Sequence, residues 1–248
     1  EIRIYLTTWT SYILFGAFTL ITAFFFQRLV IEYQLRSVEY TQYGAKEMLE
    51  QMNLTDWVIG PLFMNIAIFF LFMLPIITMR LFAEERAQKT MQLLMTLPIK
   101  PSEIVLGKYL AGVAIMAIML AITTVFPLLL HLFGKNPNGL APLDWQSIGV
   151  TYFGMFLLGA VFVAFGLFAS SLTDSQIVSV IIGFIVLMFF YVIGLAARGQ
   201  EGVWQDILTY LAVTTHLENF IRGIIRVSDV VYYLSLTFFG LYLTNKVI

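Results

Sequence analysis

The stretch Glu84–Pro98, EERAQKTMQLLMTLP, holds the densest cluster of charge in the chain, although long apolar runs flank it on both sides. If it is helical, five residues share one face: Ala83, Ala87, Thr90, Met91 and Leu94. Polar and charged side chains occupy most of the other face, and Pro98 prevents the helix from continuing. The pattern predicts a short amphipathic helix between two membrane-spanning helices.

The composition places most of the chain in lipid. Of its 248 residues, 60% are hydrophobic and only 12% are charged, whereas about a quarter of the residues in a soluble domain are charged. The absence of cysteine excludes disulfides and thiolate metal sites. A net charge of -1 argues against a nucleic-acid partner, which needs a clustered basic face.

Six apolar stretches are long enough to cross a membrane as helices. The predicted spans are residues 12–31, 57–79, 105–133, 148–170, 176–197 and 230–247. The connection of about thirty residues before the sixth span is too long for a turn and too apolar for a free loop. With no sign of a second domain, we expect one all-α polytopic membrane domain over residues 1–248.

The chain lacks the motifs of an ATPase, a metalloprotease or a serine hydrolase, and its spans lack the charges of an ion-coupled transporter. It has no G-x-x-x-x-G-K-[ST] phosphate loop, so we expect no ATPase activity from the chain itself. It also lacks the H-E-x-x-H and G-x-S-x-G motifs, and no metal site is predicted. The spans between Trp57 and Ala197 contain almost no ionisable residues, which disfavours ion-coupled transport. The energy for any uphill transport should then come from another subunit.

The charged stretch itself allows two interpretations. It is either an interfacial helix that joins two spans, or a docking element whose charged face fits a groove on a soluble partner. The docking interpretation depends on Glu84, Glu85, Arg86 and Lys89, because complementary charges fix partner choice and register. Basic residues are tied at seven on each side, but their clustering around this stretch favours a cytoplasmic location.

A family resemblance favours the docking interpretation. The sequence MRLFAEERAQKTMQLLMTLPIKPSEIVLGKYLAG, from Met79, closely resembles the segment between spans two and three of type-2 ATP-binding-cassette (ABC) permeases. The most similar subgroup is the bacterial gliding-motility-associated permeases. The matching positions are Met79-Arg80, Glu84-Glu85, Thr90, Leu93-Leu94, Pro98, Glu103 to Leu106 and Gly107-Lys108. The stretches NLTDWVIGPLF, GLFASSLTDSQIVS and HLENFIRGIIRVSDVVYYLSLT extend the resemblance, and Lys89 departs from it, since the family usually has glycine there.

The resemblance implies roles for particular residues. The charged stretch would be the cytoplasmic coupling helix, which contacts the ATPase subunit through Glu84, Glu85, Arg86, Lys89, Thr90, Leu93, Leu94 and Pro98. The turn after span four would add Ser171 and Asp174. EIRIYLTTW would form an N-terminal interfacial helix. Two short re-entrant or interfacial helices in the outer leaflet would precede span six and carry Trp204, Tyr210, His216, Phe220 and Arg222.

These expectations define a permease subunit in a bacterial inner membrane, which couples ATP hydrolysis by a separate subunit to substrate export. Its partners would be cytoplasmic ABC ATPases that bind ATP and Mg²⁺, a second permease of the same or a related sequence, and membrane lipids. A periplasmic or extracellular accessory protein is a further option. Two alternatives stay open: a mechanotransmitter or scaffold that moves no cargo, and a lipid-modifying enzyme with Glu218 near His216.

The sequence offers one more feature for helix packing. Gly166 and Ser170 lie four residues apart in the predicted fourth span, so both fall on one helix face. Small residues with this spacing let helices approach closely in a membrane. The contact would lie either at a dimer seam or within the chain.

Overall fold

The computed structural model describes residues 9–90, 100–135, 143–197 and 202–248, and this part of the chain is helical throughout, apart from short connections. The helices are α2 (Trp9–Gln42), α3 (Lys46–Gln51), the π-helical turn η1 (Thr55–Ile59), α4 (Gly60–Thr78), α5 (Arg80–Ala87), α7 (Pro101–Ile122), α8 (Val125–Phe133), α9 (Trp145–Ser171), α10 (Gln176–Ala197), α11 (Val203–Leu211), α12 (Val213–Ile221) and α13 (Val227–Val247).

Six helical stretches within the described residues are long and apolar enough to cross a membrane. They cover Ser11–Gln42, Thr55–Ala87, Pro101–Phe133, Trp145–Ser171, Gln176–Gly194 and Val227–Val247. This confirms the prediction of an all-α polytopic membrane protein. The short helices α11 and α12 lie where the resemblance implies a helical pair before span six.

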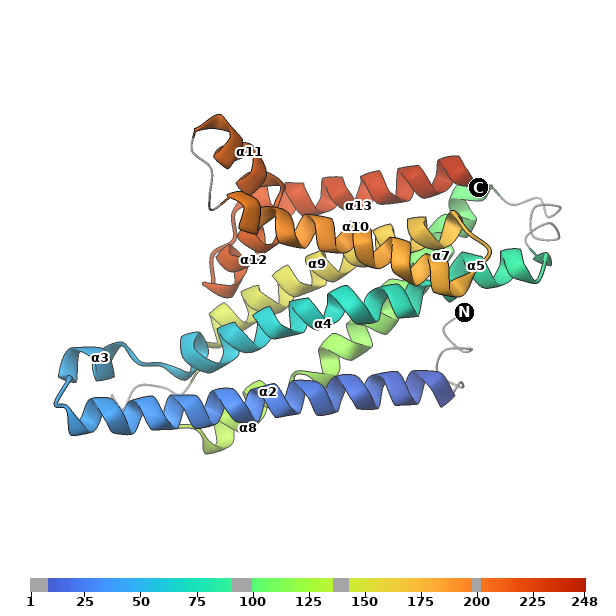
Figure 1. Ribbon diagram of the computed structural model, residues 1–248. Helices are drawn as coiled ribbons and strands as arrows, with labels where there is room; N and C mark the ends of the chain where they lie inside the picture. Colours follow the sequence, from blue (N-terminus) through green and yellow to red (C-terminus); the bar gives the residue numbers. More distant parts are fainter. Residues whose placement is uncertain (1–8, 91–99, 136–142, 198–201) are drawn as a thin grey trace.

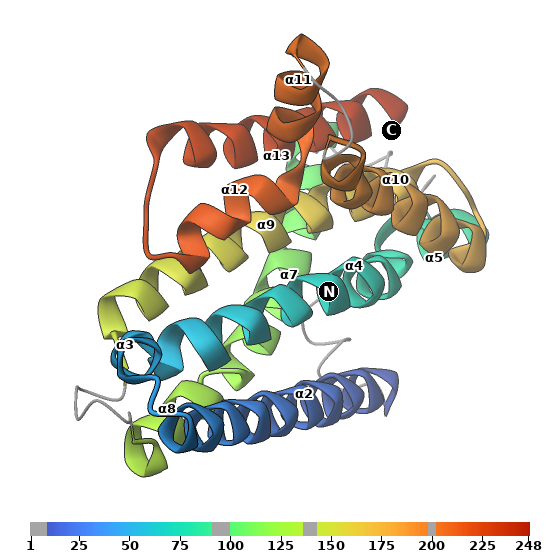
Figure 2. The ribbon, with the colours of Figure 1, turned by 60° about the vertical axis from the view of Figure 1, so that its left-hand side comes forward.

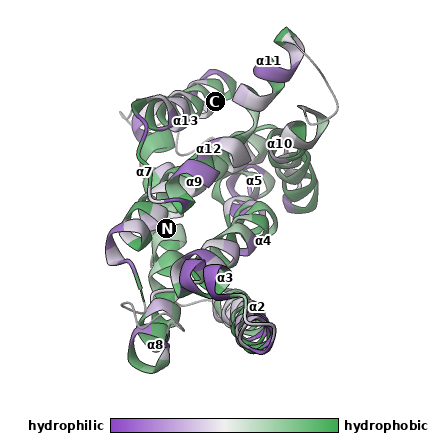
Figure 3. Cartoon of the chain, turned by 90° about the vertical axis from the view of Figure 1, so that its left-hand side faces the viewer, coloured by the Kyte–Doolittle hydropathy of each residue, from purple (hydrophilic) through white to green (hydrophobic). Residues whose placement is uncertain are grey.

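The spans form a bundle around α9. In its most apolar stretch 83% of the residues of α9 are buried, against 11% for α2, which runs along one side of the bundle (Figures 1 and 2). The two ends of the bundle are named here after Glu85 and His216. The Glu85 end holds α5 and the last residue of the chain, and the His216 end holds α3, α11 and α12 (Figure 1). Viewed from the His216 end, most of the bundle is hydrophobic and α3 is hydrophilic (Figure 3).

Small residues explain how α9 packs against so many neighbours. A Cβ atom added at Gly159 would collide with Met116 of α7, and one added at Gly166 would collide with Thr78 of α4. A Cβ atom added at Gly240 of α13 would lie 3.1 Å from the Cβ atom of Ala164, a tight contact. In lipid, where burial from water does not drive helices together, such close approach supplies much of the packing energy.

Span one is longer than predicted. The sequence predicts its end near residue 31, but α2 continues through the polar stretch to Gln42. No glycine or proline interrupts the chain between Gly16 and Gly44, so nothing breaks the helix once it leaves the apolar layer. It ends just before Gly44, whose φ of +66° lies in the left-handed region.

The prediction of a separate amphipathic helix that starts near Glu84 is wrong in its first part. After a one-residue interruption at Met79, α5 continues span two as far as Ala87. The helix then ends, because Lys89 has a φ of +58°, so the helix that holds Ala83 does not continue to Thr90. Residues 91–99 lie outside the described part, and so do Leu93, Leu94 and Pro98. Residues 1–8, most of the predicted N-terminal interfacial helix, also lie outside it.

Span three is broken into α7 and α8 at Thr123 and Thr124. Pro127 has no N–H to donate to the Thr123 carbonyl, which instead accepts from the Phe126 amide at 3.1 Å. The Thr123 hydroxyl donates to the Leu120 carbonyl at 2.6 Å and lies 3.1 Å from the Tyr152 hydroxyl of α9. Side chains thus satisfy the polar groups that the break exposes.

Candidate functional site

The charged stretch after span two is held at its base by a buried ion pair. Lys108 of α7 places its Nζ 2.7 Å from Glu85 Oε1 of α5, and the lysine side chain is only 6% exposed. The same ammonium group lies 5.1 Å from the centre of the Phe82 ring. Because α5 and α7 lead into and out of residues 88–100, this pair ties the two ends of that segment together.

A buried serine connects the same region to span four. The Ser170 hydroxyl of α9 accepts from the amides of Phe82 and Ala83, each at 3.0 Å, and donates to the Met79 carbonyl at 2.8 Å. These backbone groups lie where α4 gives way to α5. Gly166, one turn earlier, makes room for Thr78. Of the two locations considered for the Gly166 and Ser170 contact, the structure thus shows the one within the chain.

We call Glu85, Lys108 and Ser170, with the backbone of residues 79–83, the brace. It fixes the first turns of α5 against α7 and α9. In the brace Glu85 Oε2 is buried and makes no hydrogen bond to any described residue, whereas Oε1 binds Lys108. The Glu85 carboxylate is therefore engaged inside the chain, and its predicted contact with an ATPase would need a change at this site.

The other predicted contact residues differ in how open they are. Lys89, Thr90 and Asp174 are exposed. Glu84 and Arg86 are half-buried: Glu84 Oε1 accepts from Gln88, and Arg86 donates to the Val247 carbonyl at 3.5 Å. Ser171 is fully buried and donates to the Phe168 carbonyl, so its side chain does not reach a partner surface in this structure.

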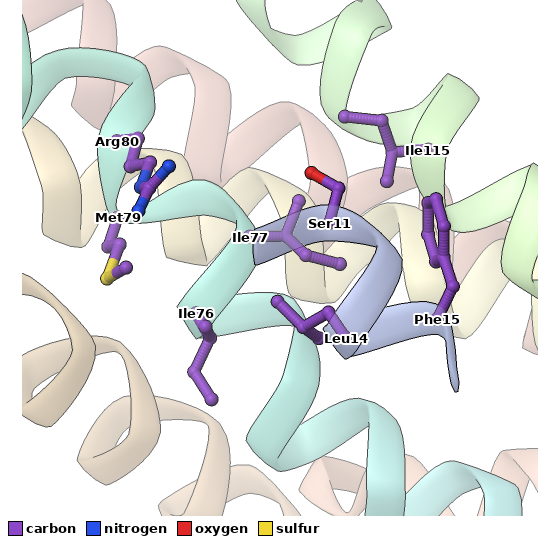
Figure 4. Close-up of a pocket in the computed structure, with 8 residues that line it drawn as sticks. All are labelled: Ser11, Leu14, Phe15, Ile76, Ile77, Met79, Arg80 and Ile115. Atoms are coloured by element: carbon purple, nitrogen blue, oxygen red, sulfur yellow. The ribbon is translucent and has the colours of Figure 1, made fainter. Parts of the chain in front are cut away.

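A small cavity lies beside the brace, between the start of α2 and the junction of α4 with α5 (Figure 4). Its volume is about 140 Å³. Its lining is Ser11, Leu14, Phe15, Ile76, Ile77, Met79, Arg80 and Ile115, mostly apolar, with Arg80 at one side. The cavity shows that α2 packs loosely against the bundle at the Glu85 end.

A second polar network lies at the opposite end, between α12 and α13. His216 Nδ1 lies 2.7 Å from Asp229 Oδ1, and both side chains are nearly inaccessible, at 7% and 4% exposed. Asn219 donates to Asp229 Oδ2 at 2.9 Å, and His216 Nε2 lies 2.8 Å from the Tyr210 carbonyl. The imidazole also stacks on the Tyr232 ring at 3.9 Å.

Hydrogen-bond chemistry fixes the protons of this network. A carbonyl oxygen only accepts, so His216 Nε2 must carry a proton and donate to Tyr210. A second proton lies between Nδ1 and the Asp229 carboxylate. The histidine and the aspartate together thus hold two protons and no net charge. With both ring nitrogens occupied, His216 is not available as a catalytic base, which removes the support for a lipid-modifying enzyme.

The five residues predicted for this region fall into two groups. Trp204, Tyr210 and Arg222 have exposed side chains, whereas His216 and Phe220 are buried. The hydroxyls of Tyr232 and Tyr233 donate to the carbonyls of Leu211 and Val213, which fastens the α11–α12 pair onto span six. The sequence analysis missed Asp229. A carboxylate in the first turn of an otherwise apolar span was the available signal.

The sequence matches the model of one protein family. The family model described as ABC-2 family transporter protein covers residues 14–244. The chain belongs to the ABC-2 family. It is therefore a multi-pass permease subunit of an ABC transporter, in a family that associates with ATP-binding subunits and a second permease and is generally not itself catalytic. The match does not extend to the gliding-motility subgroup. No curated protein matches the chain.

Proposed function

We propose that this ABC-2 permease exports a substrate from a bacterial cell, across the cytoplasmic membrane, as a pair of permeases driven by two ABC ATPases. The ATPases bind ATP and Mg²⁺, and the stretch Glu84–Pro98 docks on them from the cytoplasmic side. The observation that carries the proposal is the brace. It makes the base of the docking segment continuous with spans two, three and four, so a force on that segment reaches the membrane helices.

The brace suits this role because of its geometry. Glu85 and Lys108 join the helix that enters the segment to the helix that leaves it, which limits independent movement of the two. Ser170 fixes the same junction to α9, the most buried span. Closure of the ATPases would therefore move these spans together and change access between the two permeases.

The side chains on the surface beside α4 support an apolar class of cargo. Phe72 of α4 is 48% exposed and stacks on Phe184 of α10, with ring centres 4.8 Å apart. Farther along, Phe69 packs edge-on against Phe25 of α2 at 5.5 Å. The α4 helix carries no ionisable residue. A pathway along this surface would favour an apolar or amphipathic cargo.

The docking role can be tested by exchanging two charges. In the variant Glu84→Lys with Lys89→Glu, the net charge and the Glu85–Lys108 pair are kept, but the charge pattern facing the partner is reversed. We expect at least a tenfold loss of co-purified ATPase. The matched control exchanges the exposed pair Lys46 and Glu47 of α3, at the other end of the bundle. Unchanged ATPase recovery in the first variant, or equal loss in the control, would contradict docking at this segment.

Export is tested separately with the intact complex in vesicles. Movement of a fluorescently labelled phospholipid or of an apolar dye, dependent on ATP, is the expected result. Steady ATP turnover that moves neither probe would favour the mechanotransmitter.

A further inference from the structure

The largest cavity described at the His216 end lies between α2 and α8. Its volume is about 460 Å³, within the range of about 300–1,000 Å³ that is usual for ligand sites. The cavity beside Arg80, at about 140 Å³, falls below that range. The helices are in contact next to the larger cavity through Phe26 and Phe126, with ring centres 4.9 Å apart. The cavity is therefore bounded by α2 and α8 and, at one end, by the connection that starts at Gly134.

The cavity has an apolar body and a polar end. Its apolar lining comes from Phe26, Val30, Leu54, Leu129, Leu130, Phe133 and Gly134. The polar lining residues are Tyr33, Gln34 and Lys135, and no carboxylate is among the lining residues that the structure describes. Gln34 lies eight residues beyond Phe26 on the same helix, a rise of about 12 Å. A ligand in this site would thus meet apolar side chains first and polar side chains about two turns later.

The position of the cavity matches the boundary of the hydrocarbon layer. A layer of about 30 Å takes roughly twenty helical residues, so a span that begins at Ser11 leaves it near residue 31. Phe26 and Val30 then lie inside the layer, and Gln34 lies among the headgroups. Leu129 and Phe133 of α8 are 39% and 79% exposed, so the apolar side of the site faces lipid.

The turn at the end of α8 fixes the polar end of the site. Gly134 donates to the Leu130 carbonyl at 2.8 Å, and a Cβ atom at Gly134 would collide with that carbonyl and with the Leu54 side chain. The glycine lets the chain pass close to Leu54 and places the exposed Lys135 directly at the mouth of the cavity. A cation at headgroup depth attracts negatively charged lipid.

We propose that this cavity is a binding site for an anionic phospholipid. One acyl chain lies among Phe26, Val30 and Leu129, and the phosphate group faces Lys135. The site uses a surface away from the brace, so it does not depend on the proposed export function. A lipid bound in this cavity would contact both span one and the end of span three.

Native mass spectrometry of the full chain, with any subunits that co-purify, tests this site. Phosphatidylglycerol and phosphatidylcholine with identical acyl chains are the two probes. For the unaltered protein we expect preferential retention of phosphatidylglycerol. Lys135→Gln should lower phosphatidylglycerol binding about fivefold and leave phosphatidylcholine unchanged, since one basic residue near a membrane surface contributes about that factor. Leu129→Trp, which fills the apolar body, should lower the binding of both lipids.

The matched control is Lys46→Gln, which removes an exposed lysine from α3 at the same end of the bundle. Thermal unfolding in detergent shows whether each variant is folded. Equal binding of both lipids by all variants would mean only a general lipid shell, and equal loss in the control would mean only general charge attraction. Loss of a permease dimer in Leu129→Trp, with lipid binding intact, would assign the cavity to a second copy. Each of these three results overturns the proposal.

Discussion

The two ends of the bundle solve the same problem in different ways. Each buries a pair of ionisable side chains inside a largely apolar bundle, with Glu85 and Lys108 at one end and His216 and Asp229 at the other. At the His216 end, both ring nitrogens and both carboxylate oxygens have partners. At the Glu85 end, one carboxylate oxygen makes no hydrogen bond to the described residues, and Glu85 is 28% exposed.

This difference fits the roles of the two ends. A fully bonded polar network in a low-dielectric interior is rigid, because any movement breaks a bond that nothing replaces. The His216 network therefore acts as a fixed joint between the α11–α12 pair and span six. The Glu85 network can gain a further donor, so the Glu85 end has the more adjustable chemistry. In the function proposed above, that is the end from which ATP-driven motion would enter.

Breaking the His216 network should have the largest effect on stability. Asp229→Leu leaves one buried nitrogen of His216 and the half-buried Asn219 amide without partners, which should cost about 3 kcal/mol. Thermal unfolding in detergent measures the loss.

Asp229→Asn is the matched control. Its amide can donate to Nδ1 and its oxygen can accept from Asn219, while Nε2 still donates to Tyr210. Because the natural pair has no net charge, this variant should lose less than about 1 kcal/mol. An asparagine variant as unstable as the leucine variant would refute the assignment of two protons to the pair.

At the Glu85 end the corresponding loss should be smaller. Lys108→Met leaves the Glu85 carboxylate without its cation, but Glu85 is 28% exposed, so a small movement of its side chain brings the carboxylate to water, and we expect a loss of about 2 kcal/mol. The double variant Lys108→Met with Glu85→Leu removes both charges and should recover most of that stability. In the complex, both variants should reduce coupled ATP turnover, because the tie between α5 and α7 is lost. Normal coupling in the stable double variant would mean that the pair serves folding only.

The six spans could be predicted from the sequence, but the ion pair Glu85–Lys108 and the His216–Asp229 pair, which join helices to one another, could not. Hydrophobic length is a local property, so six apolar stretches were enough to predict six crossings. Lys108 lies 23 residues from Glu85, across a segment whose path no local pattern reveals, and Asp229 lies 13 residues from His216. Whether two such residues meet depends on how the spanning helices cross, and the crossing is determined by side-chain packing rather than by local sequence.

The positions at which helices end were also predicted poorly from the sequence. The wheel from Ala83 to Leu94 assumed a continuous helix, and a single left-handed residue, Lys89, invalidates it. The family resemblance held the relevant signal. Glycine is usual at this position in similar permeases, and glycine is the residue that a positive φ favours. The positive φ of Lys89 is therefore the conformation in which a glycine would be expected at this position.

The smaller predictions concern single helix ends, one at each end of the bundle. At the Glu85 end, Lys89→Gly should raise stability by about 0.5 kcal/mol, because glycine adopts a φ of +58° without strain. Lys89→Ala removes the same charge and keeps the strain, so it is the control for charge. Thermal unfolding of both variants decides the matter, and equal stability of the alanine and glycine variants would count against strain at Lys89.

At the His216 end, Asp144 caps α9 and should give a small dependence of stability on pH. Its Oδ1 accepts from the Gln146 amide at 3.0 Å and its Oδ2 accepts from the Ser147 hydroxyl at 2.5 Å. The Ser147 hydroxyl is the main reason that the pKa of Asp144 lies below its usual value of 3.8. A lowered pKa means that the cap contributes fully above the unfolded pKa and is lost as the pH falls through the folded one.

Asp144→Asn keeps the cap without a titrating group, so its stability should be nearly equal to that of the natural chain at pH 7 and should fall less between pH 4 and pH 2. The difference should stay below about 1 kcal/mol, because Asp144 is exposed. Ser147→Ala removes the main cause of the lowered pKa and should move the loss of the cap to higher pH. Unfolding curves across this range that are the same for all three proteins would show that the cap carries no charge-dependent stability. The hydrogen bonds at Asp144 would then contribute in the same way whether or not residue 144 carries a charge.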